Sequence, residues 1–195
     1  MRAIFQASLR QTDGSSVEVM ACDIDFIRQS PRGCVLQYTL GLREPVTGST
    51  RDQVVTGVMH RSPQALMSRV ERGGTGDAAT IANGPLSLVP YVYVPELAFL
   101  IQVFPYDHQL PGLAPLLEGW SAFEAALLAE LDLGDWQILS RANQVVRYRP
   151  TMRAMVRLEL HVREAASGHA KTRRAYAKVF ADNELGQQVH RLLQA

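Results

Sequence analysis

Apolar and polar residues alternate with a period close to two through most of the chain. The pattern runs through SVEVMA, CVLQYTL, DQVVTGVMH, LSLVPYVYV and LAFLIQVF, and returns later in NQVVRYRP, RAMVRLELHV and RRAYAKVF. Such runs, rich in Val, Ile, Leu and aromatic residues, predict strands of an antiparallel or mixed sheet. Between two of them, REPVTGSTRD has the Pro, Gly, Ser and Asp content of an exposed hairpin loop.

Two further segments have the start and stop signals of helices. SPQALMSRVERGG begins at Ser62, an N-cap followed by proline, and stops at Gly73. SAFEAALLAELDLG opens with an S-x-x-E capping box at Ser121 and ends at Gly134. We therefore expect an α+β chain, with antiparallel sheets and a few flanking helices.

The last segment, NELGQQVHRLLQA, predicts an amphipathic helix whose N-cap is Asp182 or Asn183. Its apolar residues share one stripe: Leu185, Val189, Leu192 and Leu193. Because this stripe is still in register at Ala195, we expect the natural polypeptide to continue. A fragment that ends here is expected to associate with itself through the helix, since the stripe lacks a covering lobe.

Composition and charge add limits to this picture. Nearly half of the 195 residues are apolar, which suffices for a packed core, and a formal net charge of +1 gives no overall field for nucleic acid. Cys22 and Cys34 lie in strand patterns without a CxxC spacing, which favours buried thiols in a reducing compartment. The N-terminus lacks a secretory leader, and no apolar run approaches the roughly 20 residues of a membrane helix. We expect a cytoplasmic protein that binds neither nucleic acid nor membrane.

Familiar catalytic and metal-binding patterns do not occur in the sequence. The five histidines have no paired metal-ligand spacing, and two distant cysteines do not complete a zinc site. Asp107 and His108 lie in FPYDHQLPG, whose prolines predict a turn after a strand rather than acid–base chemistry. A serine nucleophile elbow, a Walker loop and a Rossmann glycine pattern are also missing.

Residues 27–60 and residues 146–180 follow a similar pattern. Both have an apolar-Arg opening, a proline four residues later, an alternating strand, an Arg-Glu loop and a second alternating strand. The alignment needs a one-residue gap after the proline. Either an internal duplication or a chance likeness of two β-rich segments explains the match. The second copy has Lys178 where the first has Gly57 or Val58, so a shared scaffold does not require this lysine.

Lys178 is one of only two lysines, against eighteen arginines. The alternation in AYAKVF puts it on the same face of a strand as Tyr176 and Phe180. One interpretation is a side chain that snorkels along a half-exposed edge strand. The other is that a phosphate group neutralises the ammonium on a partly covered face, because burying an unpaired charge is costly.

The segments VVRYRPTMRAMVRLEL, RRAYAKVFAD and GQQVHRLLQA, in this order, resemble the nucleotide-binding lobe of the aminoglycoside phosphotransferase and choline kinase-like superfamily, which has a protein-kinase-like fold. There an R-Y-x-P-x-x-R strand turn precedes a Y-x-K-V-[FY] strand. LAFLIQVFPYDHQLPGLAPLL likewise resembles a segment that some bacterial members carry ahead of this lobe. The likeness covers roughly residues 97–195. It implies a β-rich cap domain over 1–111, and a helix plus a kinase-like lobe over 112–195.

The resemblance implies that ATP binds this lobe, with Lys178 on its phosphates. The glutamate that usually pairs with this lysine would be Glu184, although Glu184 lies only at the start of the last helix. The glycine-rich phosphate loop is replaced by RPTMRA. Arg149 and Arg153 would then contribute charge in place of backbone amides, or else they are solvated residues of an exposed face.

No catalytic residue is implied within these 195 residues. The aspartate base and the Mg²⁺-binding aspartate of the superfamily would lie in a large lobe after the last helix. LGDWQILSRAN contains Gly-Asp and Asn, but it precedes the nucleotide lobe and lacks a histidine. We interpret it as a helix-to-strand turn.

Two functional hypotheses from different classes remain. The first is the N-terminal part of an ATP-dependent small-molecule phosphotransferase, with ATP and Mg²⁺ as cofactors and a C-terminal kinase lobe as partner. The second is a complete, non-enzymatic binding or regulatory module that uses the duplicated β-sheet unit as an interaction surface. The sequence leaves the acceptor open among sugars, amino alcohols and antibiotics.

Overall fold

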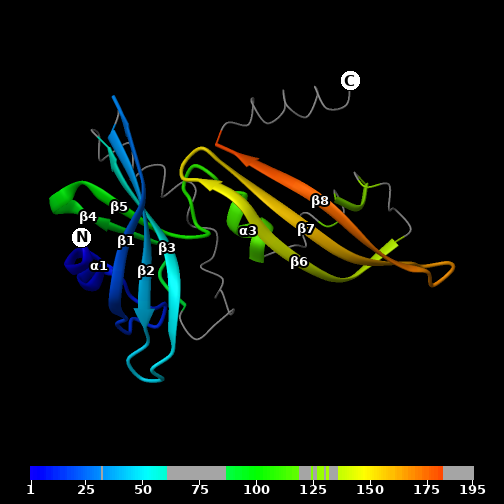
Figure 1. Cartoon of the computed structure of the whole chain (residues 1–195), viewed down its shortest axis with the longest axis horizontal. Coiled ribbons are helices and arrows are strands. Elements are labelled where there is room, and N and C mark those ends of the chain that lie inside the picture. The colour runs from blue at the N-terminus through cyan, green and yellow to red at the C-terminus, as the bar shows by residue number, and fades with distance from the viewer. Residues whose placement is uncertain are drawn as a thin grey trace. The chain divides into compact units, whose positions relative to one another are not determined.

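The computed structural model describes residues 1–31, 33–60, 87–118, 124, 127–129, 131 and 136–181. The chain divides into two compact units, Met1–Pro111 and Gly112–Ala195. Each unit has its own antiparallel sheet, so the α+β class expected from the sequence is confirmed (Figure 1). The assignment of the first unit as a cap and the second as a kinase-like lobe stays a prediction.

The first unit is built on a five-stranded sheet with the order β1-β2-β3-β5-β4. Its elements are α1 Arg2–Ser8, β1 Glu18–Ser30, β2 Gly33–Arg43, β3 Thr50–His60, β4 Tyr91–Val94, η1 Pro95–Leu97 and β5 Phe99–Val103. β4 is shorter than the strand predicted for LSLVPYVYV, which contains Pro90. A proline has no N–H to donate to a ladder, so it limits the strand.

Apolar side chains from α1 and from one face of the sheet form the core of this unit. The rings of Phe5 and Tyr38 pack edge to face with centroids 5.0 Å apart, and both side chains are almost fully buried. Other members of the core come from β2, β3 and β5: Leu40, Leu42, Val55, Phe99, Ile101 and Val103. The hairpin loop after β2 is exposed as predicted. α1, which the alternation did not predict, closes this core.

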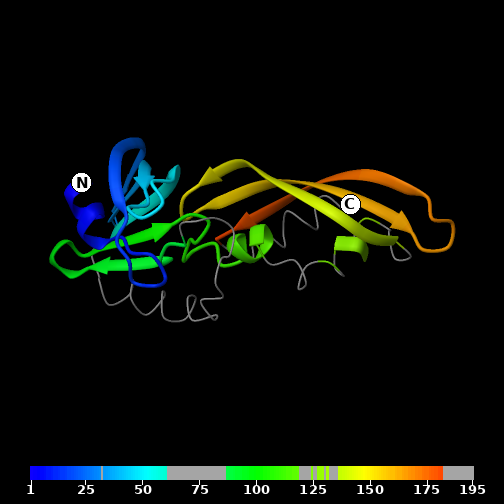
Figure 2. The same ribbon diagram turned by 90° about the horizontal axis from the view of Figure 1, so that it is seen from below.

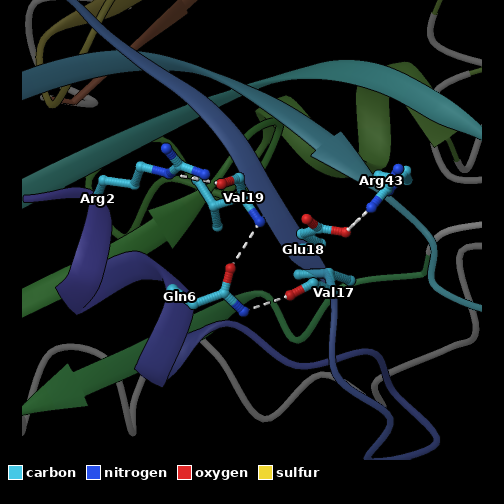
Figure 3. A network of polar contacts seen from close by, with 6 residues as sticks. All are labelled: Arg2, Gln6, Val17, Glu18, Val19 and Arg43. Atoms are coloured by element: carbon cyan, nitrogen blue, oxygen red, sulfur yellow. Dashed lines mark hydrogen bonds and ion pairs between the residues drawn. The ribbon is translucent and has the colours of Figure 1, made fainter.

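Helix α1 also covers part of the free edge of β1 (Figure 3). The side-chain amide of Gln6 donates to the carbonyl oxygen of Val17 at 2.8 Å, and its Oε1 accepts the N–H of Val19 at 2.8 Å. Arg2 Nε donates to the Val19 carbonyl oxygen at 2.7 Å. Gln6 thus bonds β1 as a neighbouring strand would, which protects the edge. Farther along, β1 exposes four large apolar side chains, Met20, Ile24, Phe26 and Ile27.

The second unit carries a three-stranded sheet with the order β6-β7-β8. Its elements are α3 Leu113–Glu118, β6 Trp136–Arg149, β7 Arg153–Glu164 and β8 Ala170–Phe180. α3 lies against one face of this sheet (Figure 2), where Asn143 Nδ2 donates to the carbonyl oxygen of Leu117 at 3.2 Å. The same face buries alternate residues of β7: Ala154, Val156, Leu158, Leu160 and Val162. We call this face the inner face and the opposite one the outer face.

Some sequence expectations for helices and turns have a different outcome. The interpretation of LGDWQILSRAN as a turn is wrong for residues 136–143, which belong to β6. A bulge between Ile138 and Ser140 interrupts the alternation there and hides the strand. The predicted helix over 62–73 and the last predicted helix, with Glu184, lie outside the described residues. So does most of the predicted helix over 121–134, of which residues 124 and 127–129 are described as helical.

The meanders β1-β2-β3 and β6-β7-β8 share one register between their second and third strands. Every pair recurs 120 positions later, from Arg43↔Thr50 and Gly33↔His60 to Arg163↔Ala170 and Arg153↔Phe180. The first and second strands are joined by residues 31–32 in one meander and 150–152 in the other. The one-residue gap of the sequence alignment therefore lies in this turn. Lys178 corresponds to Val58, and Ala177 corresponds to Gly57.

The loops between the second and third strands also match. In each loop a glycine N–H donates to a glutamate carbonyl oxygen, Gly48 to Glu44 at 2.9 Å and Gly168 to Glu164 at 3.0 Å. Both glycines have a φ of 70°, in the left-handed region that other residues adopt at a cost. In each loop the hydroxyl of the residue before the glycine donates to the glutamate carboxylate. The loops thus have the same hydrogen bonds as well as the same length.

Candidate functional site

Lys178 lies in the edge strand β8, opposite Met155 of β7. As the alternation predicts, its side chain shares the outer face with Tyr176, whereas Ala177 belongs to the inner face. The candidate site is therefore built on the outer face of the β6-β7-β8 sheet.

This face is half-buried at Met155, Arg157 and Phe180 but not at Lys178. Lys178 is exposed, and the neighbouring Tyr176 is 61% exposed, because α3 packs on the inner face. The ammonium keeps its water and needs no partner to offset desolvation. Lys178 makes no hydrogen bond or ion pair with any residue in the described part of the chain.

Four basic residues surround Met155 on the outer face. Arg147 of β6 and Lys178 of β8 lie opposite it on the two neighbouring strands. Arg153 and Arg157 lie two positions before and after it on β7. Neighbouring strands are about 4.8 Å apart and alternate residues of one strand about 6.6 Å apart, so all four side chains can reach the space above Met155. We call these five residues the cationic ring.

A further arginine borders the cationic ring at the β6–β7 turn. Arg149 pairs directly with Arg153. Like charges at directly opposite ladder positions destabilise a sheet, and a cross-strand pair typically changes the stability by about 0.2–1 kcal/mol. The Met152 N–H donates to the Arg149 carbonyl oxygen at 3.1 Å, and the Ala181 N–H donates to the Met152 carbonyl oxygen at 3.0 Å. These bonds hold the turn beside the end of β8. Arg153 pairs with Phe180, two residues from Lys178, and Arg149 lies beyond Arg153 on β6.

The acidic side chain that shares the outer face of these strands is already paired. Glu159, in the row beyond Arg157, accepts a hydrogen bond from Arg174 Nε at 2.9 Å. This hydrogen bond lowers the pKa of Glu159, and the charges of Arg174 and Arg157 lower it further. Among the described residues, no acidic side chain interacts with Arg147, Arg153 or Lys178. The cationic ring thus carries positive charge that the sheet does not balance.

The first unit has the same ladder positions without this charge. Of the four ring cations only Arg147 has a basic equivalent, Arg28, which lies opposite Val35. The other three are replaced by uncharged residues, Gly33, Gln37 and Val58. Val58 is buried in an apolar cluster with Val35 and Leu100. Because both meanders have the same register, the fold does not require the cations.

Three of the predicted site residues lie together, namely Lys178, Arg149 and Arg153. Glu184 lies outside the described residues, so its pairing with Lys178 stays a prediction. Sequence reasoning missed two of the four ring cations, Arg147 and Arg157. The spacing of Arg153, Met155 and Arg157 along one strand was a usable signal, since alternate residues share a face. The position of Arg147 depends on a bulge and could not be read from spacing.

The contacts of the other residues considered in the sequence, Asp107, His108 and the two cysteines, are those of structural residues. The Asp107 carboxylate accepts the backbone N–H two residues later at 2.9 Å, as in the predicted turn, and His108 Nδ1 lies 2.6 Å from Gln102 Oε1. Cys22 and Cys34 are free thiols in strands, but they are half-buried rather than buried. Within the described ranges, no three His, Cys, Asp or Glu side chains converge to hold a metal ion.

Two general findings bear on the site. None of the helices in the described part of the chain is both long enough and apolar enough to cross a membrane. Comparisons of the chain with protein-family models, with curated proteins and with solved structures found no match.

Proposed function

We propose that Gly112–Ala195 is the nucleotide-binding lobe of an ATP-dependent small-molecule phosphotransferase, similar to the aminoglycoside phosphotransferase and choline kinase-like superfamily. The outer face of its sheet binds the phosphates of ATP, with Lys178 as the phosphate-contacting lysine and Arg149 and Arg153 beside it. The observation that carries the proposal is the unbalanced positive charge around Met155, on an exposed face.

Phosphate is the ligand that this charge and geometry favour. The planar guanidinium of arginine offers paired N–H donors that match two phosphate oxygens. An anion between Arg149 and Arg153 would also remove the repulsion between these directly opposed charges. The turn that joins them contains no glycine, so phosphate oxygens would be held by side chains rather than by a glycine-rich backbone loop.

The chemistry of phosphoryl transfer would need groups beyond the outer face. The catalytic base and the Mg²⁺ ligands would come from the large lobe that the resemblance implies, which would also contact the acceptor. Glu184 would hold Lys178 in position if the two residues pair. The part proposed for these 195 residues is therefore nucleotide binding, not catalysis.

Calorimetric titration with a non-hydrolysable ATP analogue and Mg²⁺ tests this proposal. Lys178→Ala should weaken binding by about five-fold or more, since one charge-assisted contact is lost at an exposed site. Arg173→Ala is the matched control, because Arg173 lies on the same strand and is exposed, but it faces inward opposite Leu160. Equal affinities of the parent and the Lys178 variant, or a folded parent that does not bind the analogue, would refute the proposal.

A second candidate function is the non-enzymatic interaction module, and the free edge of β1 favours it. β1 is an edge strand with four exposed large apolar residues, including Ile24 and Ile27, and such an edge is a template for pairing with another chain. If this function is right, the parent should associate with increasing concentration in sedimentation velocity. Ile24→Lys should abolish this association without changing nucleotide binding. A variant that associates like the parent would remove β1 from the interface.

A further inference from the structure

The cationic ring has more charge, spread over a wider area, than one phosphate group needs. Arg147 and Lys178 lie on either side of Met155, two strand spacings apart, or about 10 Å. Arg153 and Arg157 are four residues apart along β7, or about 13 Å. A single phosphate above Met155 can approach only some of these side chains at once. A linear chain of phosphates can extend from one pair of cations toward the other.

We propose that the cationic ring binds a linear chain of three or more phosphates through side chains alone, with inorganic tripolyphosphate as the smallest good ligand. Arg147 and Arg157, which no sequence motif singles out, are the residues that favour this chain over pyrophosphate and orthophosphate. The inference rests on the proposed function, because the same face would hold the phosphates of ATP. It adds that neither the nucleoside nor a divalent cation is required for binding.

The surroundings of the ring fit a polyanion. Met155 forms the floor with a thioether, which is at most a weak acceptor and brings no charge of its own. Glu159 is hydrogen-bonded by Arg174 at 2.9 Å, so the nearest carboxylate on this face acts on Arg157 alone among the ring cations. Arg149 lies two residues after Arg147 and extends the positive surface along β6 toward the turn. A cluster of like charges with low-polarity surface between them strengthens the local field.

At the outer-face ladder positions around Met155, the second unit differs from the first in charge. At the matching positions the first unit has one arginine, Arg28, together with an apolar cluster that contains Val35 and Val58. The same backbone therefore supports either an apolar cluster or four cations. Arg157 is favourably placed beside Glu159. The other three cations repel one another and have no acidic partner among the described residues, so an anionic ligand accounts for their presence.

Calorimetric titration of the full chain in EDTA with tripolyphosphate, pyrophosphate and orthophosphate tests the inference. The parent should bind tripolyphosphate at least about five-fold more tightly than pyrophosphate, because more ring cations are engaged. Arg147→Ala and Arg157→Ala should each weaken tripolyphosphate binding by about two- to five-fold, as expected for exposed charge pairs, and narrow its advantage over pyrophosphate. Raising the salt concentration should weaken binding for the parent more than for either variant.

Arg163→Ala is the matched control, since Arg163 lies on the same strand and face as Arg157 but six residues, or about 20 Å, away. Arg157→Gln replaces Arg157→Ala if the alanine variant unfolds at a lower temperature than the parent.

Variants at Arg147 and Arg157 that bind tripolyphosphate like the Arg163 control would overturn the inference, while the effect of Lys178→Ala on the ATP analogue would still support the proposed function. Binding of the analogue with Mg²⁺ but not of tripolyphosphate in EDTA would overturn the inference alone. Binding of tripolyphosphate but not of the analogue would keep the polyphosphate site and refute the nucleotide function, and binding of neither would refute both.

Discussion

Replacing Gly57 by alanine tests the packing that holds the core of the first unit together. A Cβ on Gly57 would lie 2.1 Å from Cζ and 2.3 Å from Cε2 of Phe99, whereas carbon atoms in contact prefer about 3.5–4.0 Å. The backbone of β3 cannot easily yield, because Gly57 is paired with Leu36 on one side and Ile101 on the other. The Phe99 ring would have to retreat by about 1.5 Å to restore an ordinary contact. It is 1% exposed in the core, so a retreat disturbs its neighbours.

The expected cost combines two opposing contributions. Overpacking a well-packed core costs about 1–3 kcal/mol. Alanine recovers about 0.4–1 kcal/mol relative to glycine, because it lowers the entropy of the unfolded chain. We expect Gly57→Ala to lower the free energy of unfolding by about 1–2 kcal/mol. In a Phe99→Leu background the clashing ring atoms are absent, so the same substitution should be neutral or stabilising.

The measurement is a double-mutant cycle on Gly57 and Phe99. Urea unfolding of the parent, both single variants and the double variant is followed by far-ultraviolet circular dichroism. Hydrogen exchange at the amides of β3 and β5 assigns the change to the first unit. A coupling energy of at least about 1 kcal/mol is expected. If Gly57→Ala costs the same in both backgrounds, to within about 0.5 kcal/mol, the Phe99 ring is not what excludes a side chain at this position.

Three further predictions concern the loops, the edge of β1 and one half-buried tyrosine. Gly48→Ala and Gly168→Ala should each lower the free energy of unfolding by about 1–2 kcal/mol. The two decreases should be equal, because both loops have a glycine φ of 70°. Unequal decreases in urea unfolding would contradict the equivalence of the loops. Gln6→Ala should cost about 1–3 kcal/mol and speed hydrogen exchange of the Val19 amide that Gln6 Oε1 accepts; unchanged exchange would show that the edge is protected by other groups. Burial raises the pKa of Tyr91, and the Asp107 charge raises it further, while an unfolded tyrosine ionises at about pH 10. The unfolded state therefore releases its proton first, so the stability that neutral Tyr91 contributes is complete below about pH 10 and is lost as the pH rises above it. Urea unfolding of the parent and of Tyr91→Phe, measured below and above about pH 10, tests this. The free energy of unfolding should fall more steeply with pH for the parent than for the variant, and an equal fall in both would contradict the prediction.

The alternation of residues predicted which side chains share a face, but not which face is covered. It placed Lys178 with Tyr176 and apart from Ala177, and the ladder agrees. It also suggested that aromatic neighbours would shield the lysine. The cover lies instead on the inner face, where Gly112 precedes α3 and lies close to Val179. A strand that is apolar on both sides does not encode which side a distant helix will occupy.

Register was the second quantity that the sequence could not supply. In VVRYR a strict alternation would place Arg147 on the same face as Val145, which is opposite the buried Val156. A bulge between Val145 and Arg147 adds one residue, and a shift of one residue moves every later side chain to the other face. Arg147 therefore lies opposite Met155, on the outer face. Bulges depend on the partner strand, so spacing along one strand does not reveal them.

The two meanders agree at one end and differ at the other, and this contrast separates residues that the shared fold requires from residues that it does not. At the loop end, Gly48 and Gly168 share φ, hydrogen bonds and register, as expected for residues whose backbone geometry must be kept. At the turn end the second meander has one more turn residue, and an arginine stands on each side of that turn. Arginines in directly opposed positions oppose pairing rather than support it. Residues that a ladder tolerates at a cost, in a place where the sister meander folds without them, are the ones for which we propose a ligand, since an anion that meets Arg149, Arg153 and Lys178 would remove that cost.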